Sequence, residues 1–142
     1  SKKLDIYKNI RYSIHRLTIH RIPGHGGEFM KISKELLKGS TVILVLSLLE
    51  ERPMYGYEII KEIDKKSNGI FDFKEGTLYP LLHGLESDGY LESYWDKGEG
   101  NRKRKYYSIT SSGKKHIKDK KEEWTVFSKT VNKVIGGEYI WI

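Results

Sequence analysis

The sequence predicts a mainly α-helical protein with a small β-hairpin, arranged as a winged helix-turn-helix plus a long C-terminal dimerisation helix. Three helical patterns follow one another between residues 41 and 88, each with apolar side chains at helical spacing. Two strand-like segments come directly after the third helix, and a helical pattern over about residues 111–135 completes the order. Three helices, a hairpin and a further helix in this order are typical of a winged helix-turn-helix.

The first two helices are predicted from their apolar faces and from the residues that end them. Residues 41–49 are apolar nearly all round, as in a buried central helix, and Pro53 prevents its continuation. The second helix runs from about residue 56 to 67 and is closed by Asn68-Gly69, a pair that tolerates positive φ. Its expected inner face comprises Tyr57, Ile59, Ile60 and Ile63.

The third helix and the hairpin are predicted as consecutive elements. Leu78, Leu81, Leu82 and Leu85 form a buried stripe over about residues 75–88. Gly89 occupies the place of a C-terminal cap glycine. Residues 90–95 alternate as a strand, residues 97–101 form a turn, and residues 105–109 return as the second strand. In the first strand, Tyr90, Glu92 and Tyr94 share one face, and Leu91, Ser93 and Trp95 share the other.

The last helix carries an apolar stripe that calls for a partner. Thr110 is a suitable N-cap for this helix. Ile117, Trp124 and Val131 are spaced by seven residues, as in a coiled coil. The residues predicted to mediate dimerisation are Ile117, Trp124, Phe127, Val131 and Val134. Because a lone helix would expose this stripe to water, we expect a homodimer.

Composition and charge narrow the classes of function. The 142 residues include 26 Lys and Arg against 19 Asp and Glu, a net charge of +7 that favours an anionic partner. The absence of cysteine excludes disulfides, thiolate metal sites and cysteine nucleophiles. No apolar run approaches the ~20 residues that span a bilayer, and the N-terminus lacks a secretory signal. We therefore expect a cytoplasmic protein that does not insert into a membrane.

Three regions are expected along the chain: residues 1–29, a DNA-binding domain over residues 30–110, and a C-terminal helix and tail over residues 111–142. Residues 1–29 hold six basic and two acidic residues, so they contribute +4 of the net charge. An apolar stripe there, Ile6, Ile10, Ile14 and Leu17, has helical spacing. This segment is interpreted as an extension that is derived from a tag or lies upstream of the domain. The alternatives are a basic arm and a stripe that binds a membrane surface.

Candidate DNA contacts lie on the third helix and on the hairpin, or wing. The helix face opposite the leucines is the expected major-groove face. Its candidates are Lys74, Thr77, Tyr79, Pro80 and His83. Tyr79 has the alternative of packing against the second helix. The wing holds Arg102, Lys103, Arg104 and Lys105, four consecutive cations after a glycine-containing turn. Such a cluster neutralises phosphates, and a solvated hairpin tip is its alternative interpretation.

Several sequence blocks resemble the PadR family of transcriptional regulators over about residues 33–135. They are residues 46–49 (Leu-Ser-Leu-Leu), 53–59 (Pro-Met-Tyr-Gly-Tyr-Glu-Ile), 75–82 (Glu-Gly-Thr-Leu-Tyr-Pro-Leu-Leu), 85–86 with 89–91, and 104–107 with Thr110 and Gly113. The resemblance implies a homodimer that binds an operator, represses transcription and is released by a small molecule. It assigns DNA contacts to Tyr57, Thr77, Tyr79 and the wing cations.

The single long C-terminal helix resembles the small subgroup of this family, which includes multidrug-sensing repressors. That resemblance implies that Trp124 lines the dimer interface and stacks on a planar aromatic effector. The alternative role of Trp124 is simple packing between the two protomers. Residues 1–29 and the tail from Gly136 have no counterpart in the family pattern.

Other classes of function are less well supported by the sequence. Its five histidines form no His-x-x-x-His pair with an acidic partner, and neither a phosphate-binding glycine loop nor a Gly-x-Ser-x-Gly motif is present. We therefore expect no enzyme activity, no cofactor and no metal site. The main alternative is a winged-helix module that binds proteins instead of DNA, which the basic wing argues against.

Overall fold

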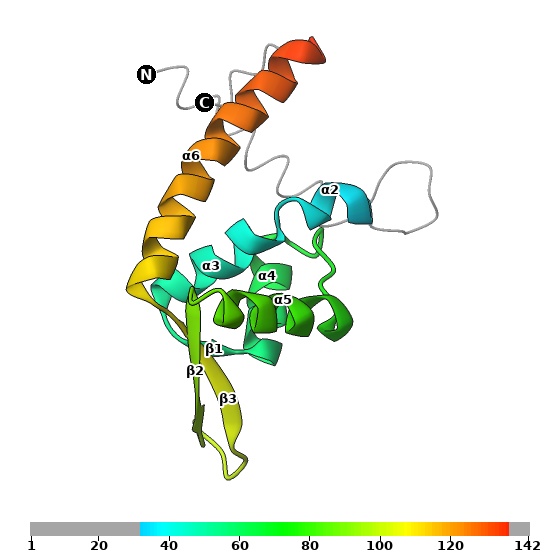
Figure 1. Ribbon diagram of the computed structural model, residues 1–142. Coiled ribbons are helices and arrows are strands. Elements are labelled where there is room, and N and C mark those ends of the chain that lie inside the picture. Colours follow the sequence, from blue (N-terminus) through cyan, green and yellow to red (C-terminus); the bar gives the residue numbers. More distant parts are fainter. Residues whose placement is uncertain (1–31, 137–142) are drawn as a thin grey trace, which may run out of the picture.

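The computed structural model describes residues 32–136, and the predictions for residues 1–29 and for residues 137–142 of the tail lie outside this range (Figure 1). The elements in chain order are α2 (Lys34–Lys38), α3 (Thr41–Glu51), β1 (Met54–Tyr55), α4 (Gly56–Lys66), α5 (Glu75–Ser87), β2 (Leu91–Asp96), β3 (Arg104–Ile109) and α6 (Ser111–Val134). This order confirms the predicted fold class. The short helix α2 and the two-residue strand β1 were not predicted, because neither is long enough to show a period.

The hydrophobic core lies between α3, α4 and α5, and the base of the wing and the first half of α6 close it. Its fully buried side chains include Val45, Leu46, Ile59, Leu78, Leu82, Tyr107 and Ile117. This packing confirms the prediction that α3 is a central helix, since α3 contacts α4, β3 and α6. The predicted inner face of α4 is wrong at one position. Tyr57 is 50% exposed, because it lies in the first turn of α4, beyond the edge of the core.

The sheet has three antiparallel strands in the order β1-β3-β2. Leu91 pairs with Ile109 and Asp96 pairs with Arg104, so the two wing strands are in register along their whole length. The predicted alternation of β2 is confirmed at its base, where Leu91 is buried and Glu92 is exposed. Strand β1 adds a third strand beside β3, which fixes the start of α4 next to the wing.

Contacts at the base of the wing fix its position between α5 and α6. Gly89 has φ +81, which only glycine adopts readily, and this confirms it as the residue that ends α5. The Thr110 side chain caps α6 by accepting from the backbone N–H of Gly113 at 3.0 Å and donates to the carbonyl of Gly89 at 2.7 Å. A Cβ on Gly113 would lie 2.2 Å from the carbonyl oxygen of Tyr90, so this crossing requires glycine.

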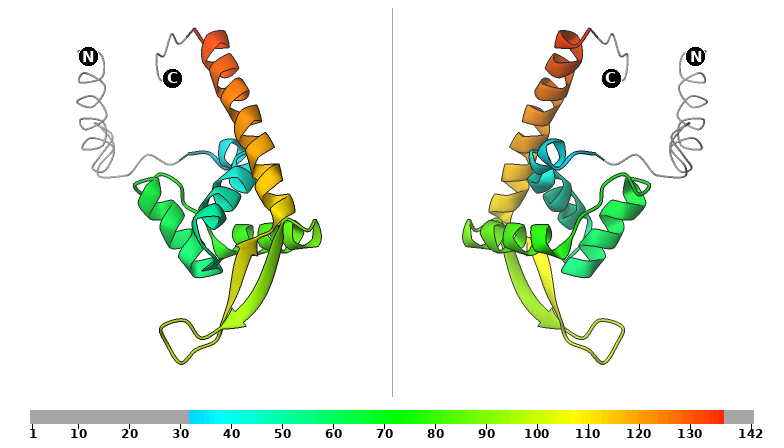
Figure 2. Two further views of the ribbon diagram at one scale, coloured as in Figure 1. Left: turned by 90° about the vertical axis from the view of Figure 1, so that its left-hand side faces the viewer. Right: turned by 90° about the vertical axis from the view of Figure 1, so that its right-hand side faces the viewer.

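The wing and α6 extend from opposite sides of the helical body (Figure 2). The hairpin tip, around residues 97–103, reaches beyond the helices on one side, and the far end of α6 reaches beyond them on the other. The molecule therefore has two separate surfaces that project away from the core. One is formed by α5 and the wing, and the other by the second half of α6.

Candidate nucleic-acid interface

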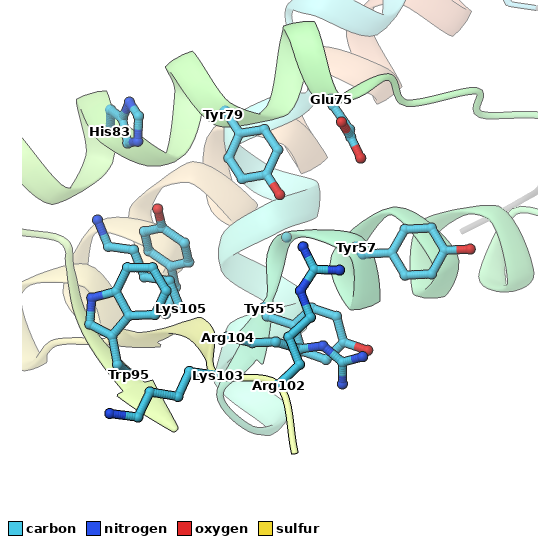
Figure 3. A pocket seen from close by; sticks show the side chains of 12 residues that line it. Tyr55, Tyr57, Glu75, Tyr79, His83, Trp95, Arg102, Lys103, Arg104 and Lys105 are labelled. Atoms are coloured by element: carbon cyan, nitrogen blue, oxygen red, sulfur yellow. The ribbon is translucent and has the colours of Figure 1, made fainter. Parts of the chain in front are cut away.

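A cleft of about 550 Å³ opens between α5, the start of α4 and the wing (Figure 3). Its walls combine aromatic rings with basic side chains. They are Tyr55, Gly56, Tyr57, Glu75, Tyr79, His83, Trp95, Arg102, Lys103, Arg104, Lys105 and Tyr107. Seven of the residues predicted to contact DNA lie together here: Tyr57, Tyr79, His83 and all four wing cations.

The four wing cations are not equivalent. The guanidinium of Arg104 lies 4.5 Å from the ring centre of Tyr55, a cation–π contact that holds the arginine beside the start of α4. The ammonium of Lys105 lies 3.9 Å from a carboxylate oxygen of Glu86 and 5.6 Å from the ring centre of Tyr107. Arg102 and Lys103 are exposed and have no ion-pair partner among residues 32–136. These two cations are therefore the most accessible to phosphate.

Glu86 connects α5 to both strands of the wing. The Ser93 hydroxyl on β2 donates a hydrogen bond to one carboxylate oxygen of Glu86, and Lys105 on β3 approaches the other. Because one side chain of α5 contacts both strands, the angle between the helix and the wing is constrained. That angle decides whether helix and wing can contact one duplex at the same time.

Tyr79 on α5 is seated against the start of α4. A Cβ on Gly56 would lie 2.8 Å from the Tyr79 hydroxyl oxygen and 2.9 Å from ring carbon Cζ, so the ring occupies the space that a larger residue would need. The Tyr79 side chain nevertheless remains 37% exposed in the cleft. Both predicted roles of Tyr79 thus fit its position, packing on the second helix and presenting a surface to the cleft.

Three predicted helix residues lie outside the cleft. Thr77 and Pro80 are exposed on α5 but do not line the cavity. Lys74 precedes the first turn of α5, and its ammonium lies 3.2 Å from a carboxylate oxygen of Asp72. Because the side chains of this pair are 75% and 48% exposed, the pair is weak and does not prevent Lys74 from meeting a phosphate.

The outer face of the wing is stiffened by a ring cluster. Tyr94 and Tyr106 stack with centroids 5.7 Å apart, and Tyr55 meets Tyr106 edge-on at 5.5 Å. Burial and the neighbouring Glu58 carboxylate raise the pKa of Tyr106. On the inner face, burial and the Glu86 carboxylate raise the pKa of Tyr107. The raised pKa values keep both phenols protonated further into alkaline pH than an ordinary tyrosine, and of the two only Tyr107 lines the cleft.

Five residues of the cleft were not among the predicted site residues: Tyr55, Gly56, Glu75, Trp95 and Tyr107. Tyr55 and Gly56 are brought there by β1, which was too short to predict. Trp95 could have been suspected from the sequence, because it lies near the end of its predicted strand. The structure buries that strand only at its base. Glu75 opens α5 and provides the acidic group of the cleft.

The residues predicted for dimerisation lie on α6, away from the cleft. Trp124, Phe127, Val131 and Val134 are 43%, 57%, 38% and 81% exposed, and the rings of Trp124 and Phe127 lie 5.8 Å apart. Ile117 differs from these four. It is fully buried in the core, so it offers no surface to a second chain.

Residues 32–136 contain no cluster of three or more His, Asp or Glu side chains placed to bind a metal ion. Among the helices described, none combines the length and the hydropathy needed to cross a bilayer.

Comparison with known proteins assigns the family. A model of the transcriptional regulator PadR-like family matches residues 45–119, which run from α3 through the wing into α6. A transcriptional regulator from Clostridium thermocellum is 42% identical with a TM-score of 0.65, covering 70% of this chain and 97% of its own. A PadR family transcriptional regulator from Eggerthella lenta is 40% identical with a TM-score of 0.63, covering 71% and 86%.

A curated relative agrees with these structures. The transcriptional regulator Rv3488 of Mycobacterium tuberculosis is 26% identical over 105 residues, which cover 74% of this chain and 92% of that protein. The relatives are described as regulators of transcription and not as enzymes. Since the family model spans more than half of the chain, including the helix and the wing that form the cleft, the protein belongs to the PadR-like family of transcriptional regulators.

Proposed function

We propose that the protein is a homodimeric repressor that binds a palindromic operator and is released by a planar aromatic effector. The observation that carries this proposal is the cleft, which four consecutive wing cations line together with Tyr79 and His83 of α5 (Figure 3). The recognition helix would enter the major groove, while the wing cations would neutralise phosphates on the adjoining backbone. The proposed DNA contacts are Tyr57, Lys74, Thr77, Tyr79, His83, Arg102, Lys103, Arg104 and Lys105.

The proposed dimer interface is the second half of α6. Trp124, Phe127 and Val131 expose apolar surface at helical spacing. A two-fold axis beside this helix would cover them and place two recognition helices about 34–36 Å apart, one turn of DNA. The resemblance of the chain to dimeric small members of the family supports the same arrangement.

The proposed effector site lies at the same interface. Trp124 and Phe127 are tilted by 39° with centroids 5.8 Å apart, and both remain largely exposed in one protomer. Paired across a two-fold axis, the two indoles would provide flat apolar faces for a planar aromatic molecule. Binding there would change the spacing of the recognition helices and so lower operator affinity.

The first test is binding of the full chain to a mixed-sequence duplex across a salt series. One variant replaces the four wing cations, Arg102, Lys103, Arg104 and Lys105, with Ala. A matched control replaces four exposed lysines of α6 outside the cleft, Lys114, Lys115, Lys118 and Lys129, with Ala. Both variants lose four positive charges, so they separate local phosphate contact from overall charge.

We expect the wing variant to bind more weakly and with a flatter salt dependence, by about 0.9 in log–log slope for each phosphate contact removed. The control variant should keep most of the slope of the full chain. Equal slopes in the two variants would contradict a phosphate-binding wing. A full chain that ignores DNA at low salt would instead identify the winged helix as a protein-binding module.

A second experiment is needed to determine whether the protein represses or activates transcription. Duplexes enriched by repeated selection on the full chain would supply an operator sequence. A reporter gene under that operator should be expressed less when the protein is present. Higher expression would show an activator and contradict the proposed repression.

A further inference from the structure

Trp95 is a large aromatic side chain that the fold leaves exposed inside the basic cleft. It lies on β2 opposite Lys105 and is 67% exposed. No ring partner accompanies it among the residues that the structure describes. Its neighbour on the opposite face of the strand, Tyr94, is 42% exposed but stacks on Tyr106 at 5.7 Å. Trp95 is therefore the more exposed of the two rings, and unlike Tyr94 it has no aromatic ring stacked on it among the described residues.

The core does not explain a tryptophan at this position. On the inner face of the wing, Leu91 and Tyr107 are buried, and they pack beneath α5 and α3. The hairpin then extends past the helical body (Figure 1), and Trp95 on this face remains largely exposed. A polar or β-branched residue would serve the strand equally well there, whereas an exposed indole leaves apolar surface in water.

The surroundings of Trp95 favour one chemical class of partner. In the cleft it lies with Lys105 and Lys103 on the wing, across from His83 on α5 (Figure 3). Lys105 is drawn back toward Glu86, so its ammonium does not cover the indole. A partner must therefore offer an apolar patch next to negative charge. The DNA backbone does so, because each deoxyribose is flanked by phosphates.

The indole itself suits this pattern. Its ring presents a flat apolar face, and its Nε1–H is a donor that cannot accept a hydrogen bond. A phosphate oxygen is an acceptor, and most protein–DNA hydrogen bonds go to the backbone. An acidic protein surface would match the cations as well, but it lacks the repeating sugar faces that would cover the ring.

We propose that Trp95 is a DNA-backbone contact, packing its ring on a deoxyribose and donating its Nε1–H to an adjacent phosphate oxygen. This inference rests on the proposed function, which supplies the DNA. Trp95 adds a neutral contact at the inner end of the wing, while Lys103 and its basic neighbours add charge. The neutral contact fixes how deeply the wing sits against the backbone and does not release counterions.

The test uses the full-length chain and a mixed-sequence duplex of about 30 base pairs, long enough for two half-sites one turn apart. Binding is followed by the anisotropy of a label on the duplex, and the environment of tryptophan by intrinsic fluorescence. Trp95→Phe keeps an aromatic face but removes the donor, and Trp95→Ala removes both. Circular dichroism and thermal unfolding establish that each variant keeps the fold. The sequence has two other tryptophans, Trp124 and Trp141, which remain in both variants.

We expect the duplex to change the fluorescence of the full chain and to leave that of Trp95→Phe nearly unchanged. Affinity should fall about two- to threefold in Trp95→Phe and about tenfold in Trp95→Ala, within the range of aromatic contacts to nucleic acid. The salt slope should stay that of the unmodified chain in both variants, because no cation is lost.

Each other outcome counts against the inference. Unchanged affinity in a folded Trp95→Ala variant, or a DNA-induced fluorescence change that persists in Trp95→Phe, would overturn the proposed contact while leaving the regulator function intact. A flatter salt slope in Trp95→Ala would mean that the residue only positions the wing cations. If the unmodified chain does not bind the duplex at low salt, the proposed function fails, and the contact fails with it.

Discussion

The cleft and the outer half of α6, residues 124–134, both expose large aromatic side chains, but different neighbours surround them. In the cleft, Trp95 lies among lysines and arginines. On α6, Trp124 lies beside Phe127, and Val131 continues the same apolar stripe. The exposed fraction of an aromatic residue therefore does not identify its partner. Its neighbours do, since basic neighbours favour DNA and aliphatic neighbours favour a second protein chain.

The largest expected effect comes from adding charge to the apolar stripe of α6. Phe127→Glu combined with Val131→Glu should convert the proposed dimer to a monomer, because four carboxylates would meet across its two-fold axis. Loss of the second half-site should lower DNA affinity on the order of a hundredfold or more. Light scattering gives the mass, and labelled-duplex anisotropy gives the affinity.

Val126→Glu is the matched control for this prediction. Val126 is 67% exposed on the same helix, but it lies on a different face from the apolar stripe. This variant should remain dimeric and bind DNA normally. A double variant that is still dimeric at micromolar concentration would contradict the proposed interface.

The next largest loss of DNA affinity is expected when the packing of Tyr79 in the cleft is disturbed. Gly56→Ala places a Cβ 2.8 Å from the Tyr79 hydroxyl, so the ring must move. We expect DNA affinity to fall about tenfold, roughly 1.4 kcal/mol of binding free energy, because the displaced Tyr79 ring no longer presents the same surface to the cleft. The thermal unfolding midpoint should change little, because the partly exposed Tyr79 ring can swing outward.

A double-mutant cycle distinguishes this role of Gly56 from a general loss of structure. If Gly56 acts through Tyr79, then adding Gly56→Ala to Tyr79→Ala should cost little further affinity. Independent, additive losses would show that Gly56 acts in another way, for instance through the backbone at the start of α4.

A smaller effect is expected when the tie between α5 and the wing is weakened. Glu86→Ala removes the acceptor for Ser93 and the partner of Lys105, so the wing should become less well oriented. We expect DNA affinity to fall about threefold to fivefold, since the ion pair is long and partly exposed. Faster amide hydrogen exchange in β2 and β3 would identify the loosened wing.

Glu86→Gln is the informative partner of that variant. Glutamine still accepts from Ser93 but no longer attracts Lys105, which becomes free to meet a phosphate. DNA affinity should therefore be closer to that of the unmodified chain than in Glu86→Ala. Affinity equal to that of Glu86→Ala would mean that charge, and not the hydrogen bond to Ser93, orients the wing.

The sequence was a good guide where local rules decide the structure. Gly89 and Thr110 were identified at their capping positions, because their roles depend on a few neighbouring residues. The alternation of β2 also emerged correctly at its base. Strand β1 was missed, since two residues show no period and their pairing with β3 depends on contacts across about fifty residues of chain.

The limits of sequence patterns were clearest for side chains with two possible environments. Tyr57 fitted the apolar spacing of α4, yet the helix begins outside the core and leaves it exposed. Ile117 shared a heptad spacing with Trp124, but α6 lies on the core only along its first half. Spacing identifies one face of a helix, and it does not say where along the helix the covering element ends.

The smallest effect on DNA is expected from Trp124→Ala, which leaves the stripe of α6 apolar and so should change operator affinity only about twofold. The same change should abolish the response to a planar aromatic dye, because it removes the flat face on which such a molecule would stack. The measurement is quenching of intrinsic fluorescence by the dye, with dye-dependent release of labelled duplex measured in parallel. Trp95→Phe is the control, since it keeps Trp124 and should preserve both dye responses. If Trp124→Ala still releases DNA when dye is added, the effector binds elsewhere and the indole only packs between protomers.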